Sequence, residues 1–201
     1  MGNLEQRINL ALLLCLLSVA LTSCNSCGDD SYSPKPRGFY RLQFPAKAYQ
    51  EYRGPCPYTF KYPTYSRILR DSSRDAQPCW INIDFPQLNG KIHLSYHPVT
   101  SQKVFNELVE DSRTFAFKHT VKATSIDEAR IMYPQKKVYG VYYTIEGNTA
   151  SSVQFFLTDS TRHYLRGALY FNEAPRIDSI KPVLDFVKKD IDVMIKSFTW
   201  K

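Results

Sequence analysis

From residue 56 onward the chain is built of short hydrophobic runs separated by turn residues, a pattern typical of β-strands. β-branched and aromatic residues dominate the runs, and turn signals such as Leu88-Asn89-Gly90 and Thr158-Asp159-Ser160 separate them. Short connections between neighbouring runs favour antiparallel hairpins. We expect strands at Cys56–Phe60, Trp80–Phe85, Lys91–Tyr96, Val138–Glu146, Ser151–Thr158 and His163–Phe171.

Two other segments repeat hydrophobic residues at helical spacing. The first runs from about Ser101 to Ala116. The second has Asp178 and Ser179 as candidate N-caps, Pro182 in its first turn and a core stripe that ends at Phe198. Its other side carries charges of both signs, which is typical of a solvent face: Lys188, Lys189, Asp190 and Asp192. Helices covering one face of a mostly antiparallel sheet predict an α+β sandwich.

The N-terminus has the layout of a lipoprotein signal peptide, residues 1–23. Arg7 precedes a leucine-rich run, and Leu21-Thr22-Ser23-Cys24 then reads as a lipobox. The apolar stretch from Ile8 to Leu21 is shorter than the roughly 20 residues that a membrane-spanning helix needs. We therefore expect Cys24 to become the lipidated first residue, so that acyl chains hold the protein at a membrane. An ordinary secretory signal with a coincidental cysteine is the alternative.

Residues 24–55 are expected to form a lipidated tether and arm ahead of a single domain at 56–201. Pro34, Pro36 and Gly38 exclude a helix there. The basic and aromatic residues of the segment form a candidate docking strip for a partner, and an arm packed along its own domain is the alternative. The strip comprises Lys35, Arg37, Phe39, Tyr40 and Arg41.

The formal net charge of +7 suits an acidic partner, an anionic lipid face or a cell-wall polymer. The basic residues are spread along the chain, however, so a solvated surface with no polyanion partner is the favoured interpretation. Nucleic acid is not expected as a partner, because the chain carries an export signal and no reader motif.

Two cysteines each open a strand-like run, Cys56 and Cys79. Export places them in an oxidising compartment, where a disulfide between them would stabilise the fold by about 3 kcal/mol. Two free thiols are the alternative. A lipidated Cys24 has no free thiol, so Cys24 and Cys27 are not interpreted as a redox or metal pair.

The sequence shows no catalytic constellation. His93 and His97 lie four apart on a strand, about 13 Å apart between their Cα atoms, which is too far for one metal ion without a bulge. Ser151-Ser152 precedes a strand rather than the helix of a nucleophile elbow. Asp84 and Asp111 are candidates for paired carboxylates, although surface or cap roles are commoner. We expect no cofactor, no metal and no small-molecule substrate.

Several strings together resemble the gliding-motility lipoprotein family GldD of Bacteroidota, nearly end to end over the mature chain. They are Pro34–Arg41 followed by Phe44-Pro45, Cys56–Pro63, Cys79–Pro86, Lys91–Tyr96, Gln154–Ser160, Leu165–Phe171, Asp178–Val183 and Ser197-Phe198. The element order is also similar to the sandwich of Mog1- and PsbP-like proteins, which bears on fold and not on function.

The resemblance implies a non-catalytic envelope lipoprotein needed for gliding and linked to type IX secretion, whose partners are envelope proteins of those systems. A cell-wall glycan- or peptidoglycan-binding protein or enzyme, and a chaperone-like module for exported clients, are alternatives. Asn25 after the lipidated cysteine favours the outer membrane, and we expect the domain to face the periplasm, although Asp29-Asp30 leaves surface export open.

Overall fold

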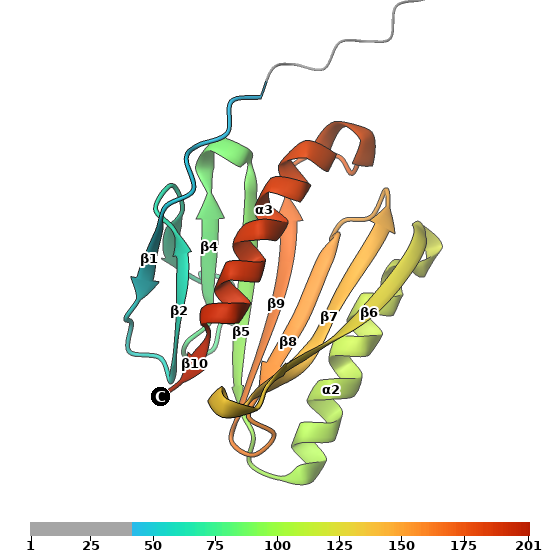
Figure 1. Cartoon of the computed structure of the whole chain (residues 1–201). Coiled ribbons are helices and arrows are strands. Elements are labelled where there is room, and N and C mark those ends of the chain that lie inside the picture. The colour runs from blue at the N-terminus through green and yellow to red at the C-terminus, as the bar shows by residue number, and fades with distance from the viewer. Residues whose placement is uncertain (1–41) are drawn as a thin grey trace, which may run out of the picture. The chain divides into compact units, whose positions relative to one another are not determined.

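The computed structural model describes residues 42–201 (Figure 1). Three strands form a small antiparallel sheet in the order β1-β2-β10, and seven form a large antiparallel sheet in the order β3-β4-β5-β9-β8-β7-β6. The strands are β1 (Tyr49–Tyr52), β2 (Tyr58–Pro63), β3 (Arg67–Arg70), β4 (Ile81–Phe85), β5 (Gly90–Pro98), β6 (Ala123–Tyr133), β7 (Val138–Gly147), β8 (Val153–Thr158), β9 (His163–Phe171) and β10 (Thr199–Trp200). The helices are α2 (Gln102–Phe117) and α3 (Ile177–Ser197), and short 3-10 turns are η2 (Pro86–Leu88), η3 (Lys118–Val121) and η4 (Pro134–Lys136).

The α+β class with a mostly antiparallel sheet and two helices is confirmed, but the helices cover opposite faces of the large sheet (Figure 1). α3 and the small sheet share a hydrophobic core with one face, where Phe155 and Leu165 are buried. α2 packs on the other face against Phe156 and Tyr164. Because successive side chains of a strand point to opposite faces, β8 is buried along its whole length.

α2 approaches the sheet through small side chains rather than through a wide apolar stripe. Ser112 and Ala116 are its buried residues, whereas Phe115 is 41% exposed. Small residues let the helix backbone come close enough for the Leu108 carbonyl to accept a hydrogen bond from the Tyr164 hydroxyl. The expected start of the helix is confirmed, since the Ser101 side chain accepts from the Val104 N–H as an N-cap.

α3 begins earlier than the sequence pattern indicates. Its N-cap is Arg176, so Pro182 lies inside the helix and Asp178 within the first turn. The Asn148 side chain accepts a hydrogen bond from the Ile177 N–H, which pairs one of the free donors at the helix start. A distant loop therefore supplies the cap that Asp178 and Ser179 were expected to provide.

The compact unit begins at Leu42, ahead of residue 56, where we expected the domain to start. Tyr49–Tyr52 form β1 and pair with β2, so the described end of the predicted arm packs along its own domain. In the part of the chain from Leu42 onward, no helix is long and apolar enough to cross a membrane.

Candidate functional site

Two cavities lie between α3 and β6, the strand at one end of the large sheet. Figure 1 shows where these two elements lie. One of about 240 Å³ lies beside Thr124, Ile177 and Leu184, and one of about 560 Å³ lies beside Ile131 and Ile195. We call this surface the α3–β6 groove.

The lining of the groove is better suited to binding a polypeptide than to catalysing a reaction. Its walls are largely apolar, and charged side chains also line both cavities: Lys181, Lys188 and Glu146 line the first, and Arg130 and Asp192 line the second. Met132, on the same strand, is 61% exposed. β6 also pairs on one side only within the described sheet, so its outer backbone groups are available to another strand.

β6 is the longest of the strands that the sequence pattern did not predict. Most of its residues are exposed or half-exposed, because an edge strand is less covered than a central one. Its sequence therefore lacks the alternation that marked the inner strands. The signal that could have revealed it is the repeated turn: Phe85-Pro86-Gln87 and Tyr133-Pro134-Gln135 both end a strand, and each is followed by a residue with positive φ, Asn89 and Lys137.

The residues considered for catalysis are not brought together as a reactive group. Asp84 pairs with Arg67 at 2.9 Å on neighbouring strands, and the buried Ser151 hydroxyl donates to the Val153 carbonyl. His93 and His97 both lie on β5. Between residues 42 and 201 no group of three or more His, Cys, Asp or Glu side chains could hold a metal ion.

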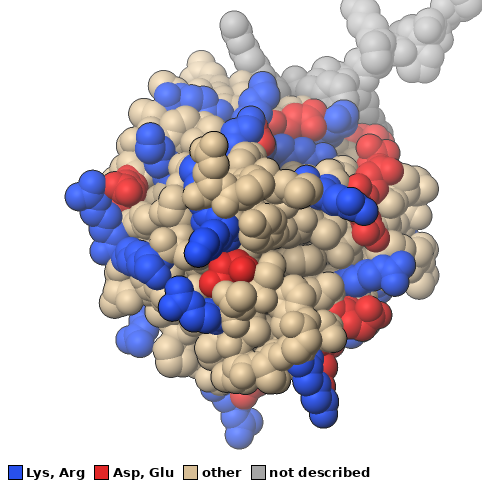
Figure 2. Space-filling view, turned by 60° about the horizontal axis from the view of Figure 1, so that its bottom comes forward, with Lys and Arg blue, Asp and Glu red and all other residues tan. Residues whose placement is uncertain are grey.

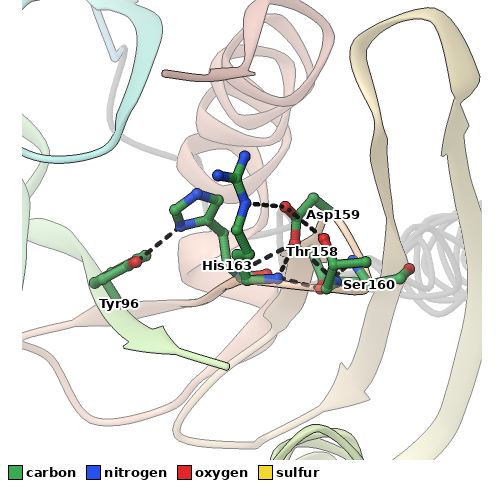
Figure 3. Close-up of polar contacts among 7 residues, drawn as sticks. Tyr96, Thr158, Asp159, Ser160 and His163 are labelled. Atoms are coloured by element: carbon green, nitrogen blue, oxygen red, sulfur yellow. Dashed lines mark hydrogen bonds and ion pairs between the residues drawn. The ribbon is translucent and has the colours of Figure 1, made fainter. Parts of the chain in front are cut away.

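The β8–β9 turn is held by one carboxylate (Figure 3). Asp159 Oδ1 accepts hydrogen bonds from the backbone N–H groups of Thr161, Arg162 and His163 at 2.8–3.0 Å. The Tyr96 hydroxyl shares a 2.8 Å hydrogen bond with Nδ1 of His163, whose ring stacks on Trp200. These contacts fasten β5, β9 and β10 to one another, so we assign the cluster a structural role.

Asp159 makes the stability of the domain depend on acid pH. Burial opposes ionisation of its carboxylate, but the three N–H donors outweigh burial and lower its pKa to about 2. The unfolded chain therefore binds the proton first, and stability that is complete above about pH 4 is lost as the pH falls toward 2. We expect Asp159→Asn to cost about 2 kcal/mol at pH 7 and to differ little from the wild type at pH 2. Urea unfolding between pH 2 and pH 7 tests this prediction. A difference in the free energy of unfolding between the two proteins that stays constant with pH would contradict it.

A buried acid anchors the N-terminal arm to α3. Asp190 is 2% exposed and accepts hydrogen bonds from Lys47 Nζ at 2.7 Å, from the Tyr49 hydroxyl at 2.9 Å and from the Tyr65 hydroxyl. Burial, then the bond to Asp190, raises the pKa of Tyr49 to about 12. The expectation that Asp190 belongs to the solvent face of the helix is therefore wrong. Its spacing from Val187 and Met194, three and four residues, is the signal that places it on the core stripe.

The structure brings Cys56 and Cys79 together, with their Cα atoms 5.4 Å apart, which is a usual separation for a disulfide. We propose that they are bonded in the exported protein. Mass spectrometry without reduction should then find both thiols blocked, and Cys79→Ser should lower stability by about 3 kcal/mol. Two free thiols in the wild type would contradict the proposal.

The remaining predicted site residues lie outside the described part of the chain. They are the lipidation candidate Cys24 and the docking-strip residues Lys35, Arg37, Phe39, Tyr40 and Arg41. On the face drawn in Figure 2, Lys and Arg lie scattered and separated by uncharged surface.

Taken together, the described residues form an α+β domain with a largely apolar groove between α3 and β6. The family model of the gliding motility lipoprotein GldD matches residues 29–200, and the chain belongs to this family. The resemblance predicted from the sequence is thus confirmed. No curated protein matches the chain. Among solved structures, it is similar to the solution structure of cyanobacterial PsbP (CyanoP) from Synechocystis sp. PCC 6803, with 14% identity, a TM-score of 0.44 and coverage of 78% of this chain and 95% of that chain.

Proposed function

We propose that the protein is a non-catalytic accessory or assembly factor for gliding motility and type IX secretion. Membership of the gliding motility lipoprotein family carries this proposal. The lipobox at Cys24 supports attachment to a membrane by acyl chains, and we propose the outer membrane with the domain facing the periplasm. In this proposal the chain binds envelope proteins and needs no cofactor.

The α3–β6 groove is the surface that we propose for the partner. β6 is long for an edge strand, at 11 residues, and β3, at the other end of the sheet, has four. An extended segment can add to such an edge through its backbone while alternate apolar side chains enter the neighbouring cavities. We therefore propose an extended, partly apolar segment of an envelope protein as the occupant, with acidic residues near Lys181 and Lys188.

The role of the lipid anchor can be tested in a depletion strain of the source organism. We expect loss of colony spreading and of secreted type IX cargo, rescued by the wild type and not by Cys24→Ala, because the unlipidated chain is not held at the membrane. Cys27→Ala is the matched control and should rescue fully. Intact secretion with an altered cell wall would contradict the proposal and favour the glycan-binding alternative.

The groove can be tested in the same strain with a photo-crosslinking residue at Met132. Leu69, on the opposite edge of the sheet and 43% exposed, is the control position. We expect crosslinks from Met132 to map to one short segment of a motility or secretion protein, and none from Leu69. Equal crosslinking at both positions, or crosslinks spread over many proteins, would overturn the assignment of this surface.

A further inference from the structure

On the face of the large sheet that carries α2, one arginine has no carboxylate partner among residues 42–201. Arg166, on β9, is half-buried, and its Nη2 donates a 2.6 Å hydrogen bond to Oε1 of Gln154 on β8. Its guanidinium lies 4.6 Å from the centroid of the Phe115 ring, at the end of α2. No acidic side chain between residues 42 and 201 forms an ion pair with it. The charge is therefore held in place by packing and one amide, and it is not neutralised by the fold.

Hydrogen-bond donors are also left over at this place. A guanidinium offers five N–H donors, and Gln154 offers two through its Nε2. Gln154 is 2% exposed, and neither its Nε2 nor the Nε of Arg166 has a partner among the described residues. Buried donors without acceptors are costly and uncommon in folded proteins. These unpaired N–H donors lie beside a positive charge. An oxyanion complements this arrangement, because it accepts hydrogen bonds and carries the opposite charge.

Two of the four histidines of the chain flank this arginine on the sheet, and a third lies on η3. His93 and His97 lie on β5 opposite Ala168 and Tyr164, so they flank Arg166 diagonally on the same face of the sheet. His119 lies on η3, four residues after Phe115, whose ring contacts the Arg166 guanidinium. The charge of Arg166 lowers the pKa of all three imidazoles.

Near neutral pH these histidines are neutral and still offer N–H hydrogen-bond donors. Burial, and then charges including Arg166, lower the pKa of His93, His97 and His119, while Asp71 and Asp111 act in the opposite direction on His93 and His97. A neutral imidazole keeps one N–H donor.

We propose that Arg166, together with His93, His97 and His119, binds the phosphate group of an anionic ligand on the α2 side of the sheet. The donors come from two adjacent strands and a 3-10 turn, so they are not confined to one plane. A tetrahedral phosphate can accept hydrogen bonds from several directions. A planar carboxylate needs only the two parallel N–H groups of a guanidinium. A phospholipid head group and a free phosphate compound share this chemistry.

The site is independent of the α3–β6 groove, because it lies on the other face of the sheet. If the α3–β6 groove proves not to bind a partner, the proposed phosphate site is therefore unaffected.

Histidine side-chain NMR of the mature protein tests the proposal with an internal control. His163 lies on the opposite face, stacked on Trp200, so it should not respond. We expect millimolar inorganic phosphate to shift the signals of His93, His97 and His119 and to leave those of His163 unchanged. Vesicles containing phosphatidylglycerol, compared with pure phosphatidylcholine vesicles, then distinguish a head group from a soluble ligand: stronger binding to the anionic vesicles identifies the lipid source.

Variants distinguish phosphate binding at this site from non-specific electrostatic attraction to a basic protein. Arg166→Gln should reduce phosphate affinity at least tenfold, whereas Arg53→Gln should not change it, because Arg53 is exposed directly after β1 and pairs with Glu51. Should Arg166→Gln fail to fold, the double variant His93→Gln, His97→Gln keeps the guanidinium and should still weaken binding several-fold. No response to either phosphate or anionic vesicles, equal shifts at all four histidines, or equal losses in Arg166→Gln and Arg53→Gln would overturn the proposal.

Discussion

Asp190→Ala is expected to release the N-terminal arm and to destabilise the domain by about 3 kcal/mol. The change removes the common acceptor of Lys47, Tyr49 and Tyr65, two of which lie in the arm. A hydrogen bond to a charged group contributes about 1.5–3 kcal/mol, and the two hydroxyls would have to find other acceptors. The ion pair itself adds less, because the Lys47 side chain is 27% exposed and its charge can turn to solvent.

The arm supplies a direct readout of this change. Lys47 is held in the structure by Asp190 and by the Phe186 carbonyl and ring, so trypsin should cleave after it slowly in the wild type. In Asp190→Ala we expect faster cleavage there, together with a lower midpoint of urea unfolding. Asp192→Asn is the matched control, since that carboxylate is exposed and, within residues 42–201, forms an ion pair with Lys196 alone. Unchanged cleavage in Asp190→Ala would mean that Asp190 does not hold the arm.

Met194→Asp is expected to cost more than 4 kcal/mol and to leave little folded protein at 37 °C. Met194 is 1% exposed and belongs to the core that α3 shares with the large sheet. An aspartate there has to enter the core charged without a partner, or become protonated, and both are costly.

Met194→Leu conserves volume and should cost less than about 1.5 kcal/mol, so it separates the effect of charge from that of altered packing. Thermal unfolding followed by circular dichroism measures both variants. A melting temperature for Met194→Asp equal to that of the wild type would show that this side of α3 faces water.

The inner strands and α2 could be predicted from the chain because their signals are local. β4, β5, β8 and β9 are buried on at least one face, so hydrophobic side chains recur along them. Ser101 marks the start of α2 because an N-cap depends only on the residues beside it. The start of α3 does not follow this rule, since its first N–H donates to a loop residue, Asn148, far away in the sequence.

Each candidate site depends on residues that are distant in the sequence. Arg166 is a single charge within the buried run Leu165–Leu169, which marks it as unusual, but only strand pairing places it between His93 and His97. The α3–β6 groove likewise exists because β6 ends the large sheet while α3 returns across the same face.

The amino-acid sequence by itself determined the family, the α+β class and most of the strands, because these depend on motifs and on the period of hydrophobic residues. The tertiary structure decided which faces the helices cover, that Asp190 is buried beneath the arm, and that Arg166 has no acidic partner among the described residues. Burial and pairing are properties of the register between elements, and a short-range pattern along the chain does not encode that register.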